Sequence, residues 1–459
     1  MEHIIVVLSK YIMVGMIVLF TIESCILVAR QGKKNNFFLL GTQIFLIFAY
    51  HFMGFITLVI QKEDMVYVFL YVFEVILIFA MLVLFKAIYS ECNQFLMNNM
   101  CMLFALGSVI LARLSLSQAV KQFVIMVIAF MAAMVIPYLL AKFRIWRELG
   151  FLCGAVGIFV LGVVLVVGSV TNGSKLSYTL FDITFQPSEV VKILFIFFLA
   201  CFLWKADKFH NVVIATVGAA IHVLILVLSK DLGSALIYYV AYVIMLYVAT
   251  RKELYLLTGI SAATIGSYIA YQLFTHVQVR VEAWLDPWND INDTGYQITQ
   301  SLFAIGTGGW FGLGLQEGTP KSIPLVETDF IFSAISEEMG AITGICLIII
   351  SFTCFLIMLY LTWKVEDKFY GLIALGIGTT YLFQTFLTIG GGTKFIPLTG
   401  VTLPFISYGG TSVLATVIMF IIVQGVDLAY KEQEKLREKT KRKTTKVKRP
   451  TKLKTNSKD

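Results

Sequence analysis

Residues 151–170 read FLCGAVGIFVLGVVLVVGSV, a run of twenty residues without a charged side chain. A helix of about twenty apolar residues is long enough to cross the hydrocarbon core of a bilayer. By the same window the sequence contains about thirteen apolar runs, centred near Leu19, Leu46, Ile76, Val109, Ala129, Phe159, Ile196, Gly218, Ala241, Ala262, Ile348, Leu375 and Ala415. We therefore predict an all-α, polytopic membrane protein with about thirteen transmembrane helices.

The composition of the 459-residue chain agrees with this class. Hydrophobic residues make up 58% of the chain, charged residues make up 14%, and the mean hydropathy is +0.85. Soluble domains carry about 25% charged residues. The composition therefore excludes a soluble globular enzyme, a disordered protein and a fibrous protein.

The net charge of +8 comes from the C-terminal tail, because residues 430–459 hold 13 Lys and Arg against 4 Asp and Glu. After a hydrophobic body, such a tail marks the cytoplasmic side and contacts anionic lipid more often than nucleic acid. We predict that 430–459 is a disordered basic tail. A topology anchor is favoured over a specific partner site, and no nucleic-acid partner is expected.

The short basic loops give the orientation. They fall on alternate loops, all on the side of the basic tail: Arg30–Lys34, Lys142–Arg147, Lys205–Lys208, Arg251–Lys252 and Lys364–Lys368. By the positive-inside rule this side is cytoplasmic. We predict a multi-pass membrane protein with its N-terminus outside and its C-terminus in the cytoplasm.

One outside loop, 274–328, is much longer than the others and contains aromatic residues such as Trp284, Trp288 and Trp310. A loop of this length in a compact protein is usually functional or disordered. The aromatic residues argue against disorder, so we expect part of this loop to fold back on the membrane surface.

Charged side chains within or beside the predicted spans are the first candidates for a site. Glu189 and Lys192 share one face of a helix, whereas Asp231 and Asp329 open their spans. Each has a structural explanation, as an ion pair or a helix cap. Together they suggest a cavity that opens outward and accepts a substrate with an anionic head and a lipid tail. The single charges at Glu23, Glu74, Arg113 and His222 are interpreted as packing or snorkelling residues.

From about Met100 onward, over about 330 residues, the chain resembles the SEDS family (FtsW, RodA, SpoVE), whose members are multi-pass proteins of the bacterial plasma membrane. Six motifs in a fixed order carry the resemblance. They are QPSEVVK (186–192), KDLG (230–233), GYQITQSL (295–302), TDFIF (328–332), EEMG (337–340) and PLTGVTLPFISYGG (397–410). The resemblance implies a ten-helix core at 100–429, an added N-terminal three-helix module at 1–99 and the tail at 430–459.

The resemblance also implies a function. Members of the family are glycosyltransferases that polymerise lipid II, an undecaprenyl diphosphate that carries a disaccharide-peptide, during elongation, division or sporulation. Their usual partner is a class B penicillin-binding protein, together with other divisome or elongasome proteins. A lipid II flippase and an inactive scaffold remain alternatives. Internal inverted repeats would favour transport, and the sequence shows no clear internal repeat.

Asp329 resembles the essential aspartate of the family, and we predict that it is the general base for the acceptor hydroxyl. Arg280 and Lys192 are predicted to bind the diphosphate, with Lys394 as a further cation. Glu189, Gln297 and Ser407 lie in or beside the shared motifs and are predicted to contact substrate. A divalent metal, Mg²⁺ or Mn²⁺, held by Asp329 or Glu327, is left open.

The chain departs from the family pattern at several positions. Ser177 stands where Trp is usual, Leu325 replaces a Glu, and Glu327 replaces a His or Gln. Thr184 and Phe185 stand where a basic residue is common. These departures leave open the subfamily and the level of activity, but the aspartate itself is retained.

Overall fold

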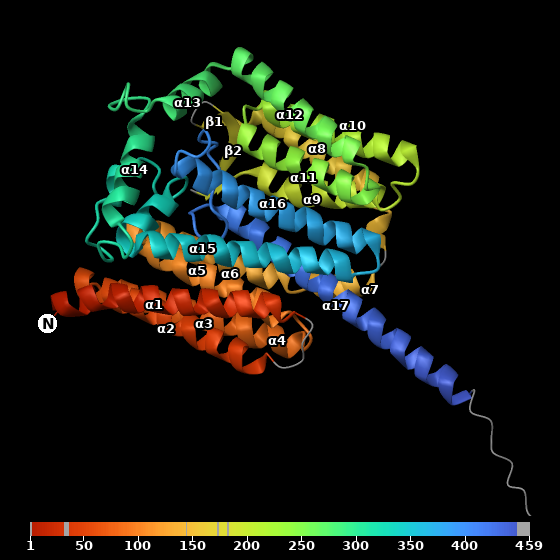
Figure 1. The fold of residues 1–459 in the computed structure, drawn as a ribbon, viewed down its shortest axis with the longest axis horizontal. Coiled ribbons are helices and arrows are strands. Elements are labelled where there is room, and N and C mark those ends of the chain that lie inside the picture. Colours follow the sequence, from red (N-terminus) through yellow and green to blue (C-terminus); the bar gives the residue numbers. More distant parts are fainter. Residues whose placement is uncertain (1, 32–35, 144, 172–173, 181–182, 448–459) are drawn as a thin grey trace, which may run out of the picture.

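Long apolar helices run side by side through the computed structural model, which describes residues 2–31, 36–143, 145–171, 174–180 and 183–447 (Figure 1). The first half of the bundle consists of α1 (Glu2–Ala29), α2 (Phe37–Lys62), α3 (Val66–Phe79), α4 (Phe85–Ile88), α5 (Gln94–Leu114), α6 (Leu116–Ala133), α7 (Ile136–Lys142) and α8 (Gly150–Val167). The second half consists of α9 (Pro187–Leu203), α10 (Phe209–Leu228), α11 (Leu232–Thr250), α12 (Glu253–Leu273), α13 (Thr275–Leu285), α14 (Tyr296–Gly308), α15 (Ile331–Lys364), α16 (Lys368–Gly392) and α17 (Gly410–Val447).

By length and composition, 11 helices among the described residues can cross a membrane. They coincide with eleven of the predicted spans, and the other two predicted spans contain the shorter helices α8 and α9. The prediction of a polytopic α-helical membrane protein is confirmed. The exact number of thirteen spans stays a prediction.

The bundle has two sides and a shared centre (Figure 1). Helices α1 to α4 form the N-terminal module on one side, and α8 to α12 form the other side. Every residue of α5 is buried, and this helix packs against α1, α2, α6 and α15. By contrast, α12 has no buried residue and forms the outer edge. The apolar run that Arg113 interrupts is therefore the most enclosed helix of the fold.

The two ends of the bundle differ in character (Figure 1). One end carries α13, α14 and the start of α1, and we call it the loop end. At the opposite end, the basic end, α17 leaves the bundle and continues as a helix to Val447. The prediction of a tail disordered from residue 430 therefore does not hold for 430–447, and 448–459 lie outside the described residues. Ion pairs from Lys435 to Glu91 and from Arg437 to Glu366 tie the extension to neighbouring loops.

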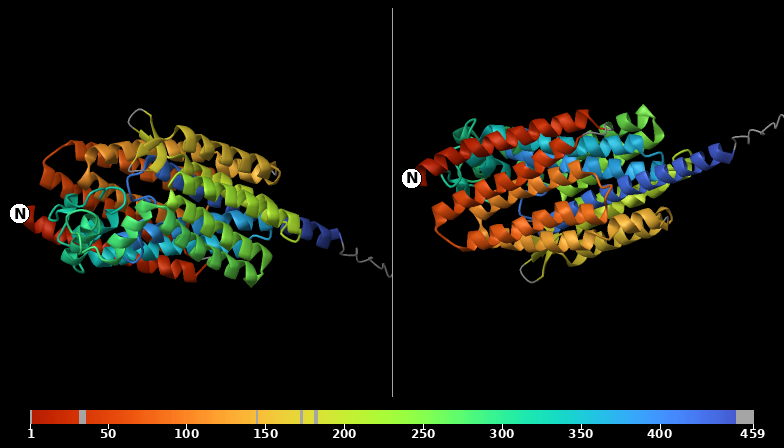
Figure 2. Two further views of the ribbon diagram at one scale, coloured as in Figure 1. Left: turned by 90° about the horizontal axis from the view of Figure 1, so that it is seen from above. Right: turned by 90° about the horizontal axis from the view of Figure 1, so that it is seen from below.

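A small antiparallel sheet connects α8 to α9, an element that the apolar pattern did not predict. It consists of β1 (Ser169–Thr171), β2 (Ser174–Leu180) and β3 (Ile183–Phe185), in the order β1-β2-β3. Figure 2 shows it on one side of the bundle near the loop end. The departures at Ser177 and Thr184 lie in these strands.

Local sequence explains several helix starts. Asn93 caps α5 because its side-chain oxygen accepts a hydrogen bond from the backbone N–H of Leu96, at 3.2 Å. Asp231 caps α11 in the same way, through the N–H of Ser234 at 3.1 Å. Pro187 takes the first position of α9, where its missing N–H costs no hydrogen bond. These caps fix the register of the helices that carry the motifs.

Helix α15 is broken at Gly340, which has φ 87° and ψ 162°. The first part, 331–339, is thus a short buried helix that begins two residues after Asp329. Because the helical hydrogen bonds are interrupted at Gly340, other segments must hold this short helix in place.

Candidate active site

The motif at 397–410 forms the floor of the site, and its backbone is anchored on several sides. The Thr388 hydroxyl donates to the carbonyl of Val401 at 3.0 Å, and the Gln384 amide donates to the carbonyl of Thr402 at 3.0 Å. The Ser407 hydroxyl donates to the carbonyl of Thr328 and accepts from the N–H of Leu403. The backbone just before Asp329 is therefore held by this loop.

Gly400 is the point at which the loop approaches the charged residues. It has φ 72°, a conformation that side chains with a Cβ rarely adopt. A Cβ at this position would lie 3.7 Å from Arg280 Nη2 and 3.7 Å from Asp329 Oδ2. The guanidinium and the carboxylate thus face the same small space, and the glycine keeps that space open.

Asp329 lies between the long loop and α15, and its side chain is half-buried. Burial raises its pKa to about 6, while a hydrogen bond with Thr328 and the positive charge of Arg280 act in the opposite direction. A carboxylate with a pKa near the working pH is a better general base than one with an ordinary pKa. The prediction of a base at this position is consistent with its surroundings.

Arg280 reaches the site from α13, a helix within the long loop. Its Nη1 donates to the carbonyl of Leu398 at 3.3 Å, which directs the guanidinium over the floor. Burial lowers its pKa, and Asp329 and Asp231 favour its charged form. It remains a cation at neutral pH because an arginine pKa is far above 7. The long loop therefore brings a cation to the carboxylate.

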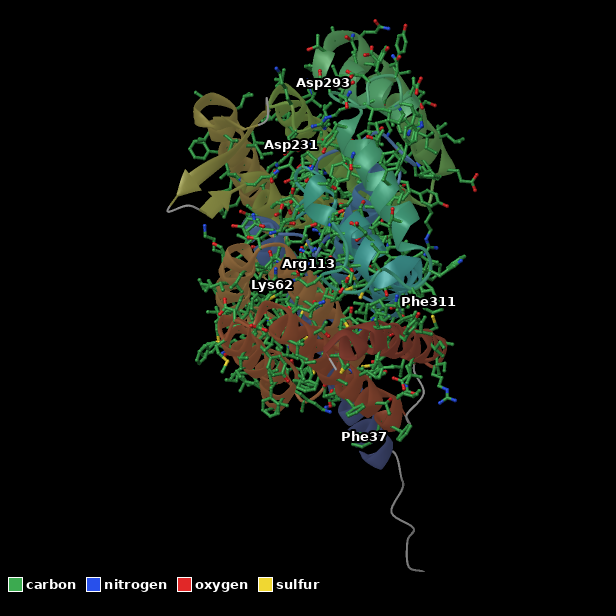
Figure 3. The ribbon with its side chains drawn as sticks, turned by 90° about the vertical axis from the view of Figure 1, so that its left-hand side faces the viewer. Phe37, Lys62, Arg113, Asp231, Asp293 and Phe311 are labelled. Atoms are coloured by element: carbon green, nitrogen blue, oxygen red, sulfur yellow. The ribbon has the colours of Figure 1, made fainter. Side chains whose placement is uncertain are left out.

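Asp231 lies near Arg280, and both oxygens of its carboxylate accept hydrogen bonds from neighbouring residues of the fold. Its carboxylate accepts from the hydroxyl of Ser188 at 3.1 Å and from the amide of Gln186 at 3.3 Å. The next residue but one, Gly233, packs under the floor, because a Cβ there would lie 3.0 Å from the carbonyl of Thr399. The QPSE and KDLG motifs are thus joined to each other and support the floor (Asp231 is labelled in Figure 3).

Glu189 and Lys192 form a separate buried ion pair. The ammonium of Lys192 lies 2.7 Å from Glu189 Oε2 and donates to Gln384 Oε1, also at 2.7 Å. Their side chains are 6% and 3% exposed. The structure therefore places Lys192 inside the bundle, with hydrogen bonds to two neighbours. Its predicted role in diphosphate binding, and that of Glu189 in substrate contact, stay predictions.

The other predicted residues differ in their surroundings. Lys394 is half-buried, and its backbone carbonyl accepts from Trp284 Nε1 at 3.2 Å, which links the segment before the floor to α13. Gln297 is half-buried in the first turn of α14. Glu327 is also half-buried, and its carbonyl accepts from the N–H of Tyr408 at 2.8 Å. Ser407 is fully buried, and the bonds of its hydroxyl hold the backbone.

A metal site is not preformed in the described part of the chain, where no group of three or more His, Cys, Asp or Glu side chains lies close enough to hold an ion. Mg²⁺ commonly binds through one or two carboxylates and the phosphates of its substrate. Asp329 is a suitable oxygen ligand of that kind. A metal shared with the substrate therefore stays a prediction.

Two features of the site region could not be recognised from sequence. Gly400 looks like an ordinary turn glycine, and only its φ and its neighbours show its role. Arg113 was interpreted as a single charge, but it forms a buried ion pair with Glu338 at 2.7 Å (Arg113 is labelled in Figure 3). These two residues are 225 positions apart, so no local pattern could join them.

Comparisons with known proteins agree on one class. The family model FTSW_RODA_SPOVE, described as cell cycle protein, matches residues 93–432. Peptidoglycan glycosyltransferase RodA of Mycobacterium tuberculosis is 37% identical over 294 residues, which are 60% of this chain and 62% of that protein. The probable peptidoglycan glycosyltransferase FtsW of Saccharophagus degradans is 32% identical over 321 residues, 67% of this chain and 82% of that protein.

Solved structures show the same fold. The rod shape determining protein RodA of Thermus thermophilus has a TM-score of 0.56 and 22% identity, and the alignment covers 73% of this chain and 97% of that chain. A chain from a peptidoglycan synthase complex has a TM-score of 0.62 and 24% identity, and covers 73% and 98%.

The fold and the match to the family model thus define a polytopic α-helical membrane protein. The chain belongs to the FtsW/RodA/SpoVE family, also called SEDS. The family match begins at residue 93, so α1 to α4 lie outside it. The alignment with the mycobacterial RodA spans less than two thirds of that relative.

Proposed function

We propose that this protein is a peptidoglycan glycosyltransferase that polymerises lipid II into glycan strands at the outer face of the cytoplasmic membrane. One observation carries the proposal: Asp329 Oδ2 and Arg280 Nη2 lie at equal distance, 3.7 Å, from the open position above Gly400. A base and a cation that face one space suit a reaction in which a hydroxyl loses a proton and a diphosphate leaves.

Asp329 takes the proton from the 4-hydroxyl of the acceptor sugar. The hydroxyl oxygen forms a bond with the anomeric carbon of the donor, and the bond from that carbon to the diphosphate oxygen breaks. The diphosphate leaves as a stable anion and needs charge neutralisation rather than a proton. This explains why one carboxylate suffices, whereas most glycoside hydrolases use two.

Arg280 holds the diphosphate, because a guanidinium makes bidentate contacts with phosphate oxygens. Lys394 is a second candidate cation, because its backbone is bonded to Trp284 on the helix that carries Arg280. A Mg²⁺ or Mn²⁺ ion shared between Asp329 and the diphosphate would neutralise further charge.

The proposed orientation has this site on the outer side of the membrane. The extension of α17 belongs to the basic end, whereas α13 and α14 lie at the loop end (Figure 1). Arg280 lies on α13, and Asp329 directly precedes α15. The positive-inside rule then puts the basic end in the cytoplasm. Lipid II that has been carried to the outer leaflet would present its diphosphate at the level of the site.

The partner is proposed to be a class B penicillin-binding protein that cross-links the new strands. The support is the fold shared with a chain of a structure described as a peptidoglycan synthase complex that coordinates polymerization and crosslinking. Other proteins of cell-wall assembly would join this pair.

The test is polymerisation of lipid II by the purified full-length protein in vesicles, with and without a class B partner. Glycan strands from the wild type, and none from Asp329→Asn, are expected. Transfer of lipid II between leaflets without any strands would instead favour a flippase. Neither transfer nor strands, with the partner present, would favour a scaffold.

A further inference from the structure

The break in α15 is closed by a segment from the long loop, residues 309–318, which we call the strap. Its N–H groups at Leu313 and Gly314 donate to the carbonyls of Glu337 and Glu338 at 2.9 and 3.0 Å. In return, the N–H of Ala341 donates to the carbonyl of Gly309 at 2.9 Å. The strap therefore satisfies backbone groups that the broken helix leaves without helical partners.

The strap and the break fit against each other too closely for side chains. A Cβ on Gly312 would lie 2.3 Å from the carbonyl oxygen of Glu338. A Cβ on Gly340 would lie 2.4 Å from the carbonyl oxygen of Trp310. A small displacement of the strap would therefore change the position of 331–339, the short helix that follows Asp329.

The N-terminal module contacts this strap from the other side. The ammonium of Lys10, on α1, donates to the carbonyl of Gly312 at 3.1 Å. The rings of Tyr11 and Phe311 lie 5.5 Å apart, and the Gln61 amide, on α2, donates to Glu317 at 3.4 Å. Figure 3 shows Phe311 beside the module at the loop end. Two helices of the module thus touch one segment of the long loop.

Lys10 lies in an apolar helix and is half-buried. A charged side chain within a transmembrane segment is costly and usually has a function. Its ammonium carries a charge-assisted hydrogen bond to a carbonyl, which is stronger than a neutral one. This bond is made to Gly312, whose Cβ, if it had one, would lie 2.3 Å from the carbonyl oxygen of Glu338 at the break.

The module is docked firmly enough to serve as a support. Towards the basic end, buried side chains connect α1, α2, α5 and α15. Gln43 donates to Ser24 at 2.9 Å, Ser24 to Asn99 at 3.2 Å, and Asn99 to Thr353 at 3.0 Å. A buried network with its groups satisfied fixes helices relative to each other.

We infer that the N-terminal module is a positioning element of the active site, and that Lys10 is its principal positioning residue. Lys10 holds the strap across the break in α15. The strap in turn holds the short helix 331–339, which fixes the position of Asp329. The inference rests on the proposed function and adds to it a role for the part of the chain that the family match does not cover.

The test compares Lys10→Met, which keeps the length of the side chain and removes its charge, with Lys62→Met. Lys62 is an exposed lysine of the same module (Figure 3). Full-length proteins in vesicles are assayed for polymerisation of lipid II and for hydrogen exchange at the amides of Leu313, Gly314 and Ala341. Lys10→Met is expected to lower kcat about tenfold, because small displacements at a site are costly, with KM little changed. Hydrogen exchange at the three amides should become faster. In Lys10→Arg, which keeps the positive charge, kcat and the exchange rates should equal those of the wild type.

Equal exchange and equal kcat in Lys10→Met and Lys62→Met would overturn the inference. If the wild type forms no strands, the proposed function fails, but the exchange comparison still decides whether Lys10 holds the strap. If Lys10→Met does not fold, Gln61→Leu replaces it, since this change removes the contact with Glu317 from the other helix. Faster exchange in the strap is again expected, and unchanged exchange refutes the inference.

Discussion

Two pairs of a carboxylate and a cation belong to the shared motifs and the long loop, and they differ in how they are satisfied. In the first, the Lys192 ammonium lies 2.7 Å from Glu189 and 2.7 Å from Gln384, and both charged side chains are buried. In the second, Asp329 and Arg280 are half-buried and face a common space above Gly400. The first pair has its hydrogen bonds within the fold, whereas the second faces a position at which a Cβ on Gly400 would make only ordinary contacts.

A charged motif in the sequence does not show whether its side chains form a structural ion pair or a reactive site. A buried ion pair in contact with a third polar group has its hydrogen bonds completed within the fold and stabilises the arrangement of helices. A desolvated carboxylate beside a cation, with room between them, keeps an altered pKa and free bonding capacity, which is the condition of a reactive site. The predictions below test this division of roles.

The largest effect is expected for Asp329→Asn. The amide cannot accept a proton, so the polymerisation rate should fall by about a thousandfold, within the range for loss of a general base. Strand length and rate are measured with purified lipid II. Asp293→Asn, at an exposed position of the same long loop (Figure 3), is the control and should keep full activity. Full activity of Asp329→Asn would remove the base from the mechanism.

Arg280→Ala should lower kcat/KM for lipid II about a hundredfold, because a preorganised donor to a developing anion is lost. Arg280→Lys should recover only part of this, since lysine cannot make the bidentate contact. Steady-state kinetics with lipid II are the measurement. Equal activity of Arg280→Lys and the wild type would show that charge alone suffices.

The same substitution also tests the electrostatic link to Asp329. The pKa of Asp329 is about 6, and only its deprotonated form acts as a base. Activity of the wild type should therefore fall as the pH decreases through about 6. Arg280 favours the charged carboxylate, so Arg280→Ala should raise this pKa and move the acid limb to higher pH. An unmoved limb in the pH dependence of kcat/KM would show that the two charges do not interact.

Gly400→Ala should lower polymerisation about tenfold, because small displacements at a site are costly. The methyl group would enter the space between Arg280 and Asp329, and φ 72° is unfavourable for alanine. Gly306→Ala is the matched control, since Gly306 lies in α14 with nothing within 4 Å of the added carbon. Similar rates for both variants would mean that the space above Gly400 is not used by substrate.

Sequence alone predicted the parts of this molecule that depend on local composition. The apolar runs predicted the positions of the helices, and the motif with Asp329 indicated a candidate site, whose role in catalysis stays a prediction. It could not show that Arg113 has a partner 225 residues away, because that pairing depends on how α5 packs against α15. It also missed the helix at 430–447, whose charged residues pair with Glu91 and Glu366 on loops distant in sequence.

The smallest effect on catalysis is expected for Lys192→Met, and it separates the two pairs most directly. Loss of one partner leaves Glu189 buried without its cation, which should destabilise the protein by about 3–5 kcal/mol. The double variant Glu189→Gln/Lys192→Met removes both charges and should recover most of that stability. For folded molecules, KM for lipid II should stay within about twofold of the wild type, because the bonds of Lys192 go to Glu189 and Gln384. If Lys192 bound the substrate, its loss would raise KM. Thermal unfolding and KM are measured on the same preparations. A strongly raised KM at unchanged stability would instead place Lys192 on the diphosphate and join the two pairs into one site.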